Sequence, residues 1–219
     1  MKHIYILFSF FLLLAVASCG GDDEPKNENN NKHEAVDLGL SVKWASCNLG
    51  AKKPEDAGNY YAFGETSPKS DYSWSTYTIC KKEECRTSSD PIYLDIAGTK
   101  FDAAHINWGG TWRTPTKDQF DELMEKCTWT KTTKNGVIGY EVKGRNGNTI
   151  FLPSANAYVG NKLFEYGDTD KIEGCYWSST VCTSVSYEST ALFAELGRKI
   201  VDWDVWDRCY GLTIRPVCN

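Results

Sequence analysis

A cluster of aromatic and acidic residues near the C-terminus has the chemistry of a ring-binding site. Trp203, Trp206 and Tyr210 lie close together in the chain, and Asp202 and Asp204 flank the first of them. Flat aromatic faces stack on sugar rings or aromatic ligands, and carboxylates add directional hydrogen bonds. The same rings could instead fill the core, because alternation along a strand would bury Trp203 as easily as expose it. The pattern predicts a ring-binding site, with core packing as the alternative.

Acidic residues suggest two further kinds of chemistry. On a strand, Asp202 and Asp204 would point to one face about 6–7 Å apart, a spacing that could suit glycoside hydrolysis. Acids two positions apart on an exposed strand face are more often simply solvated. Asp168, Asp170 and Glu173 form an oxygen-rich stretch that could hold Ca²⁺, although it lacks the full ligand spacing of a known calcium loop.

Other candidates for catalysis are few. Of the three His residues, His3 and His33 belong to the N-terminal segments discussed below. His105 follows two Ala in a short apolar stretch, where a structural role is favoured. No Gly-x-Ser-x-Gly, phosphate-binding loop or His-Glu-x-x-His pattern occurs. We therefore expect a protein that binds rather than catalyses, with no cofactor apart from the calcium considered above.

The elements that must position these residues are mostly strands. Apolar and polar residues alternate in short runs, and Asn146-Gly147 is a strong hairpin signal. We expect strands at residues 36–44, 60–63, 138–142, 149–152, 174–180, 191–196, 199–203 and 212–217. Residues 65–98 and 158–173 are polar and lack periodicity, so we expect loops there.

One amphipathic helix is predicted more strongly than any other. Thr116 can cap its N-terminus with Gln119 reaching back, and Phe120 and Leu123 begin an apolar face at helical spacing. A short helix is expected at residues 102–106. One main helix with a mostly antiparallel sheet and long loops is an α+β fold.

The N-terminus has the pattern of an export signal. Lys2 precedes an apolar run from Ile4 to Val16, and small residues lead to Cys19. The run is too short to span a membrane comfortably. Because a Cys stands at the cut, the pattern resembles a bacterial lipobox, which implies a signal peptide over residues 1–18 and lipidation of Cys19. An ordinary secretory signal with a chance Cys is the alternative.

Residues 19–34 are expected to form a flexible tether. Three acids at 22–24 follow Cys19, and residues 25–32 are polar and Asn-rich, so they bury too little apolar surface to order themselves. An acidic cluster just after a lipobox resembles the surface-export signal of lipoproteins from the Bacteroides group. This implies an outer-membrane lipoprotein exposed at the cell surface, with a periplasm-facing lipoprotein as the alternative. Residues 35–219 would form a single domain.

The charge balance limits which classes of binding partner are expected. The formal net charge is −5, and Lys and Arg are scattered along the chain. This charge balance argues against nucleic acid as the partner, because a protein that binds nucleic acid is expected to present a basic face. Attachment to the membrane would come from lipid, which leaves an extracellular glycan or protein as the expected partner.

Cysteine usage agrees with export. The chain has nine Cys, and setting Cys19 aside leaves eight: Cys47, Cys80, Cys85, Cys127, Cys175, Cys182, Cys209 and Cys218. An even number in an oxidising route makes disulfides plausible. Zinc is a weaker alternative, because no Cys-x-x-Cys pair is present and His residues are few. Some of these cysteines could also be buried, reduced and inert.

Several blocks of the sequence resemble one family. They run in order through nearly the whole expected domain, at residues 36–45, 58–66, 102–105, 108–116, 146–148, 150–153, 176–179 and 211–217. Together they resemble the Fibrobacter succinogenes major paralogous domain family, which is abundant in lipoproteins of the Bacteroides group. That family has no common ligand to carry over to particular residues.

A more distant resemblance concerns the fold. Arg113-Thr114-Pro115-Thr116 and residues 211–217 resemble the formylglycine-generating enzyme superfamily, which implies a C-type-lectin-like fold. The enzyme of that superfamily works through a redox cysteine pair late in its chain. Here the only Cys-x4-Cys, formed by Cys80 and Cys85, precedes the Arg-Thr-Pro-Thr block, so that activity is not expected.

A disulfide between Cys80 and Cys85 is predicted. Both lie in a polar segment that has little apolar surface to hold it in place. A bridge between them would reduce the conformational freedom of the unfolded chain. The family resemblance supports this pair, since a Cys pair often brackets this segment in similar chains. Cys175 and Cys182 would stand about 23 Å apart along an extended strand, beyond the roughly 7 Å limit for a disulfide. We therefore expect separate partners for these two.

Two functions follow from these observations. The first is a surface-anchored recognition or adhesion module whose ligand is unidentified, a glycan being one candidate. The alternative is a structural or interaction subunit of a cell-surface assembly that binds no small ligand.

Overall fold

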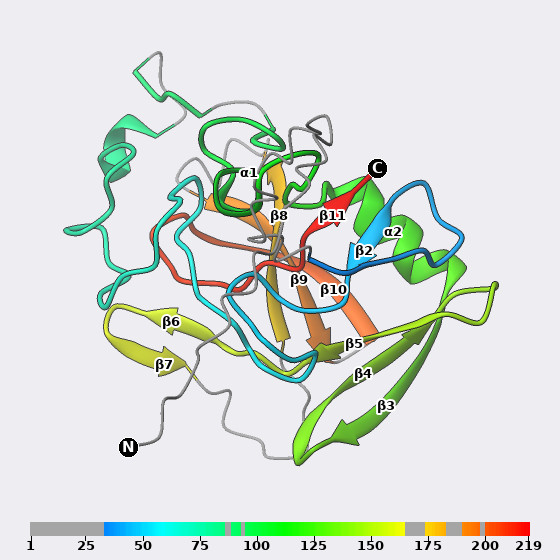
Figure 1. The fold of residues 1–219 in the computed structure, drawn as a ribbon. Coiled ribbons are helices and arrows are strands. Elements are labelled where there is room, and N and C mark those ends of the chain that lie inside the picture. Colours follow the sequence, from blue (N-terminus) through cyan, green and yellow to red (C-terminus); the bar gives the residue numbers. More distant parts are fainter. Residues whose placement is uncertain (1–32, 86–88, 93–94, 165–173, 183–189, 198–199) are drawn as a thin grey trace, which may run out of the picture. The chain divides into compact units, whose positions relative to one another are not determined.

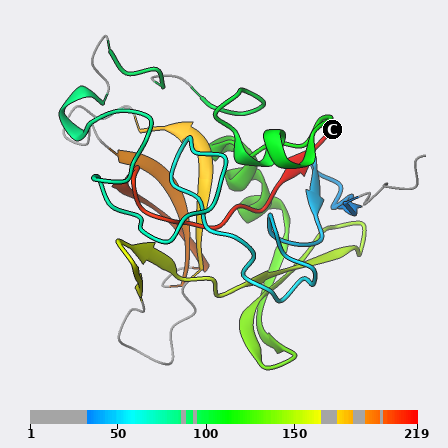
Figure 2. The same ribbon diagram turned by 60° about the vertical axis from the view of Figure 1, so that its left-hand side comes forward.

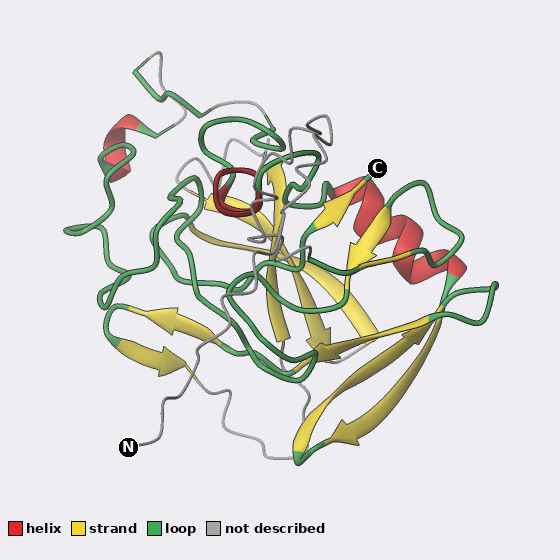
Figure 3. Ribbon diagram, in the orientation of Figure 1, coloured by secondary structure: helices red, strands yellow, loops and turns green. Residues whose placement is uncertain are grey.

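The computed structural model shows an α+β fold built mostly from antiparallel sheet (Figures 1 and 3). It describes residues 33–85, 89–92, 95–164, 174–182, 190–197 and 200–219. One unit runs from His33 to Asn219, so it begins two residues before the expected boundary at Ala35. The named strands pair antiparallel throughout, as the alternating pattern predicts.

The first sheet joins the two ends of this unit. β1 (Ala35–Val36) pairs with β2 (Lys43–Ala45), and β2 pairs with β11 (Val217–Cys218). Residues 36–44, expected as a strand or the start of a hairpin, thus form the pair β1–β2 rather than one continuous strand. Trp44 stands in the central strand and is fully buried, which anchors the small sheet in the core.

The second sheet carries the predicted ring-binding residues. Its order is β10 (Ile200–Asp207), β9 (Thr190–Gly197) and β8 (Gly174–Val181). Helix α2 (Lys117–Lys126) packs against β8 and β9. Figure 2 shows β8, β9 and β10 as a curved layer. The three expected strands are confirmed, and β10 runs on beyond residue 203 to Asp207.

The third sheet contains a strand that the sequence pattern did not predict. Its order is β3 (Thr128–Lys134), β4 (Val137–Lys143) and β5 (Thr149–Pro153). The hairpin of β4 and β5 confirms the Asn-Gly signal at 146–147. β3 and β4 are joined by a second Asn-Gly turn, where Asn135 and Gly136 have φ of 48° and 86°. Such left-handed pairs suit two-residue hairpins.

Part of the expected polar insert is a hairpin. β6 (Ala157–Val159) pairs with β7 (Lys162–Phe164), and this hairpin projects as a separate ribbon in Figures 1 and 2. Tyr158 of β6 also bridges to Gly211. A Cβ at Gly211 would lie 2.7 Å from the ring of Tyr72, so only glycine fits this close approach.

Two expected strands are replaced by single bridges. At residues 60–63 and 212–217 the chain crosses other segments at isolated positions, including Tyr61 to Leu212 and Tyr176 to Thr213. Alternating apolar residues here serve core packing rather than a ladder. β11 retains only the last part of the expected C-terminal strand.

Both expected helices are present. α1 (Ala103–Trp108) is capped by Asp102, and α2 begins at Lys117 with the predicted capping box of Thr116 and Gln119. Within its described residues, the long segment expected as loop contains one helix, the 3-10 helix η1 (Lys82–Glu84) (Figure 3). In the part of the chain that the structure describes, no helix is long and apolar enough to cross a membrane.

Among the described residues, three groups of buried side chains form the core. The α2 core lies between helix and sheets and includes Trp44, Phe120, Leu123, Val142, Leu152 and Tyr176. The central core includes Phe63, Ala104, Trp177, Leu212 and Ile214. The disulfide core consists of Ala62, Tyr72, Tyr77, Cys80, Cys85 and Cys209.

Candidate functional site

β10 directs Trp203 and Trp206 to different parts of the core. Side chains alternate along a strand, so residues three positions apart point to opposite faces. Trp203 packs against the α2 core, whereas Trp206 packs against the central core. Tyr210 follows β10 and meets Trp206 edge-to-face, with ring centroids 5.7 Å apart. The structure therefore brings Trp206 and Tyr210 together and separates Trp203 from them.

Trp203 is attached to helix α2. Its Nε1 donates a hydrogen bond of 2.7 Å to Asp121 Oδ1, and its ring meets Phe120 edge-to-face at 5.9 Å. Lys117 Nζ lies 4.9 Å from the centroid of the indole and forms an ion pair with Asp121. These contacts hold α2 on the second sheet, which favours the packing alternative for this indole.

The acidic residues predicted as ligands have different placements. Asp204 is exposed, and its Oδ1 accepts a hydrogen bond of 2.7 Å from the backbone N–H of Val205. Asp202 lies on β10 opposite Glu195. The predicted calcium ligands and the predicted lipidation site lie outside the described residues: Asp168, Asp170, Glu173 and Cys19. Within the described ranges, no three His, Cys, Asp or Glu side chains group as metal ligands.

Five rings from three segments lie around the end of β10. We call them the aromatic junction: Trp74, Tyr158, Phe164, Trp206 and Tyr210. Phe164 of β7 meets Trp206 edge-to-face at 5.9 Å. Trp74, Tyr158 and Tyr210 pack against the disulfide core, while Trp206 and Tyr210 pack against the central core. Phe164 is 41% exposed and the other four are half-buried, so the rings are fixed from behind while part of each reaches the surface.

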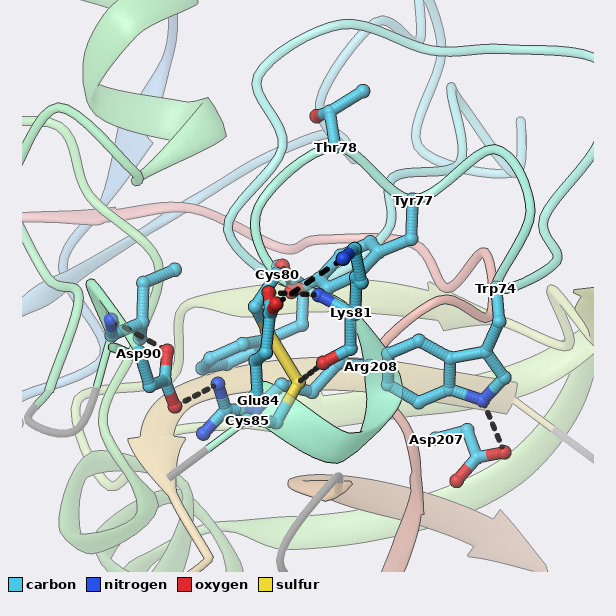
Figure 4. The surroundings of a disulfide bond; sticks show 12 residues. Trp74, Tyr77, Thr78, Cys80, Lys81, Glu84, Cys85, Asp90, Asp207 and Arg208 are labelled. Carbon is cyan, nitrogen blue, oxygen red and sulfur yellow. Dashed lines mark hydrogen bonds and ion pairs between the residues drawn. A yellow bond between two sulfur atoms is a disulfide. The ribbon is translucent and has the colours of Figure 1, made fainter. Parts of the chain in front are cut away.

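Two charged side chains border the aromatic junction. Asp207 Oδ2 accepts a hydrogen bond of 3.0 Å from Trp74 Nε1 (Figure 4). Lys82 Nζ lies 3.7 Å from the same oxygen and 5.7 Å from the centroid of the Trp74 ring. Burial, and then the nearby Asp207, raise the pKa of Tyr210, so its hydroxyl stays protonated. Ring faces beside a hydroxyl, an ammonium and a carboxylate provide stacking together with directional hydrogen bonds.

A disulfide and a buried ion pair hold the loop that carries Trp74 (Figure 4). Cys80 and Cys85 are bonded, with Cα atoms 5.8 Å apart, which confirms the predicted pair. Arg208 Nη1, just after β10, lies 2.9 Å from Asp90 Oδ2, and both side chains are fully buried. The loop is thus tied to the end of β10, where the aromatic junction lies.

For Cys175 and Cys182, the structure confirms one expectation about disulfide pairing and contradicts another. Cys175 lies at the start of β8, Cys182 directly follows its end, and the two do not bond to each other, as predicted. Cys182 is a buried thiol, so the expectation of a disulfide partner for it is wrong. Burial, and then Asp207, raise the pKa of Cys209 to about 12, which keeps this thiol protonated within the disulfide core.

Two hollows elsewhere offer less directional bonding. They adjoin at Lys100 and Phe101 and have volumes of about 490 and about 320 Å³. In the larger hollow, Glu65 is 2.7 Å from Lys69 Nζ and accepts a hydrogen bond of 2.8 Å from the backbone N–H of Thr78. Its carboxylate is therefore committed to partners within the chain.

Sequence reasoning found two members of the aromatic junction and missed three. Trp206 and Tyr210 are neighbours in the chain, whereas Trp74, Tyr158 and Phe164 come from the two polar segments expected as loops. Each is an aromatic residue in a segment that has no strand or helix periodicity, so no local pattern marked it as part of a site. Only the long-range pairing of these segments brings the rings together.

Comparison with protein-family models, with curated proteins and with solved structures gives no match for this chain. The family resemblance drawn from the sequence blocks therefore stays a prediction. The candidate site is interpreted from its own geometry.

Proposed function

We propose that this protein is a recognition module that binds a ring-bearing ligand at the aromatic junction, with a glycan as the expected class. The observation that carries the proposal is that partly exposed rings of three segments lie around the end of β10. Phe164, Trp206 and Tyr210 are in ring contact, and Trp74 and Tyr158 pack with Tyr210 against the disulfide core. Sugar rings bind to aromatic faces through their apolar side and to polar groups through their hydroxyls. Lys82, Asp207 and the Tyr210 hydroxyl would supply those polar groups.

The scaffold behind the rings favours binding over chemistry. The disulfide and the Arg208–Asp90 pair restrain the Trp74 loop, and Gly211 lets the Tyr72 ring pack closely beneath the bridge to β6. A surface that is already ordered loses less conformational entropy when a ligand binds. These restraints would support affinity without any catalytic group.

The proposed setting is the cell surface, on an outer-membrane lipoprotein anchored through Cys19. The lipobox-like pattern, the acidic cluster and the polar tether support this setting. The α+β architecture with long loops is compatible with a C-type-lectin-like fold and with the Fibrobacter succinogenes major paralogous domain family. Both assignments are part of the proposal.

Binding of the unit His33–Asn219 to glycan and protein arrays tests the proposed function. We expect a specific hit that Trp206→Ala and Tyr210→Ala each abolish. Trp129→Ala is the matched control, because it removes a half-buried indole from β3 and leaves the aromatic junction intact. A hit that survives Trp206→Ala in a folded protein would contradict the assigned site, and the absence of any hit would contradict the function.

The alternative is an interaction subunit of a cell-surface assembly. Leu163 and Phe164 favour it, because they are adjacent on β7 and 39% and 41% exposed. Partners that co-purify with the wild-type protein and are lost in Leu163→Ser would support this alternative. Retention of glycan binding by Leu163→Ser would separate the two functions.

A further inference from the structure

Trp108 and Trp112 form a rigid corner at the end of α1. Their ring centroids are 5.0 Å apart and the indole planes meet at 85°. Gly109 and Gly110, with φ of 68° and 58°, turn the chain between them, a conformation that glycine adopts without strain. The backbone N–H of Trp112 donates 3.2 Å to Gly109 O, which closes the turn.

The corner is rigid on both sides. Trp108 packs with its inner side against the central core. Trp112 is followed by Arg113, whose backbone exchanges two hydrogen bonds of 2.9 Å with Val217. Both indoles are half-buried, so each retains ring surface outside the core.

One planar ring of the chain already occupies the corner. The imidazole of His33 lies flat on Trp108, with centroids 3.7 Å apart and planes within 9°. It meets Trp112 edge-on, at 6.4 Å and 86°. One wall therefore stacks on the face of the ring and the other meets its edge. Burial lowers the pKa of His33, which favours the neutral ring.

The segment that carries this ring is extended and bound through its backbone. Ser46 N–H donates a hydrogen bond of 3.0 Å to Glu34 O, and β1 begins at Ala35. The ring and the adjacent peptide are thus recognised together. A flat aromatic side chain on an extended peptide reproduces both ring contacts and the adjacent backbone hydrogen bond, whereas a free sugar ring has no peptide group to supply that bond.

We propose that the Trp108–Trp112 corner is a binding site for a neutral aromatic side chain on an extended polypeptide segment, and that His33 is its resident occupant. The site is separate from the aromatic junction and does not depend on a glycan ligand. While His33 occupies the corner, the first residue of the folded unit is held against α1. A polypeptide that supplies a competing aromatic side chain would release it.

Chemical rescue with imidazole at pH 8, where the free ring is neutral, tests this site in the whole chain. His33→Ala should empty the corner, and imidazole should then shift the indole N–H resonances of Trp108 and Trp112 saturably. His33→Phe refills the corner with a flat ring and should block imidazole, as the wild-type protein does. Adding Trp112→Ala to His33→Ala should weaken imidazole binding by about two- to tenfold, since one edge-to-face contact is lost.

Two results would overturn the proposal. One is the absence of saturable imidazole binding to a folded His33→Ala protein. The other is equal binding to the wild-type, His33→Ala and His33→Phe proteins, which would place imidazole elsewhere. Assignment of the two indole signals by Trp108→Phe and Trp112→Phe keeps the readout specific to the corner.

Discussion

Asp102 carries more structural hydrogen bonds than its role at a helix start requires. Its carboxylate caps α1 by accepting from the N–H groups of Ala104 at 3.0 Å and His105 at 3.4 Å. It also accepts from Gly98 N–H at 2.8 Å and from the Thr114 hydroxyl at 2.7 Å. Because Ala104 and Thr114 are fully buried along with Asp102, their donors depend on its carboxylate for a partner.

Asp102→Ala should destabilise the protein by about 3–5 kcal/mol, since it leaves several buried donors without an acceptor. Asp102→Asn keeps the shape and should cost less. Asp118→Ala is the control, because Asp118 is exposed at the start of α2 and should change stability by at most about 0.5 kcal/mol. Chemical denaturation measures all three, and equal stabilities for the Ala variants would contradict the role of Asp102.

For single residues, the sequence predicts the local structure well but does not predict which residues far apart in the chain contact one another. The spacing around residue 102 indicates a helix start, but nothing in it shows that Thr114 donates to the same carboxylate. Strand alternation alone would have separated Trp203 from Trp206. The pairing of Trp206 with Phe164 depends on where the β6–β7 hairpin lies, which local pattern does not encode.

Helix α2 is the element that the sequence predicts most fully. Its capping box is formed as expected, and Phe120 and Leu123 are fully buried in the α2 core. Leu123→Ala should cost about 2–5 kcal/mol, and Thr116→Ala about 1 kcal/mol through the lost cap. Thermal unfolding checks both against Glu125→Ala, an exposed control on the same helix. An unchanged melting temperature for Leu123→Ala would contradict the assigned face.

The errors in the strand predictions have a common cause. β3 is polar on both faces and nearly all exposed, so it lacks the apolar alternation that marks a strand. Its Asn135-Gly136 turn was the available signal. Residues 60–63 and 212–217 have the alternation but meet their partners at single bridges. Periodicity reports which side chains are buried, not how far a ladder extends.

For the whole molecule, a few buried polar ties connect sheets that local pattern treats as separate. Arg215 is fully buried, and its guanidinium donates to Asn48 Oδ1 at 2.7 Å, Ala45 O at 3.0 Å and Phe151 O at 2.7 Å. It therefore links the first sheet to β5 of the third. The Arg208–Asp90 pair ties the long loop to the end of β10, and the disulfide closes a short ring within that loop.

Cys19→Ala should move the protein from the membrane fraction to the soluble fraction. The expectation rests on the lipobox-like pattern and the polar character of residues 20–32, which offer no other apolar attachment. Fractionation with metabolic fatty-acid labelling measures it. Cys47→Ala is the matched control, because Cys47 is a thiol within the folded unit and should leave attachment and labelling unchanged. A Cys19→Ala protein that stays membrane-bound, or that still incorporates the fatty acid, would show that the anchor lies elsewhere.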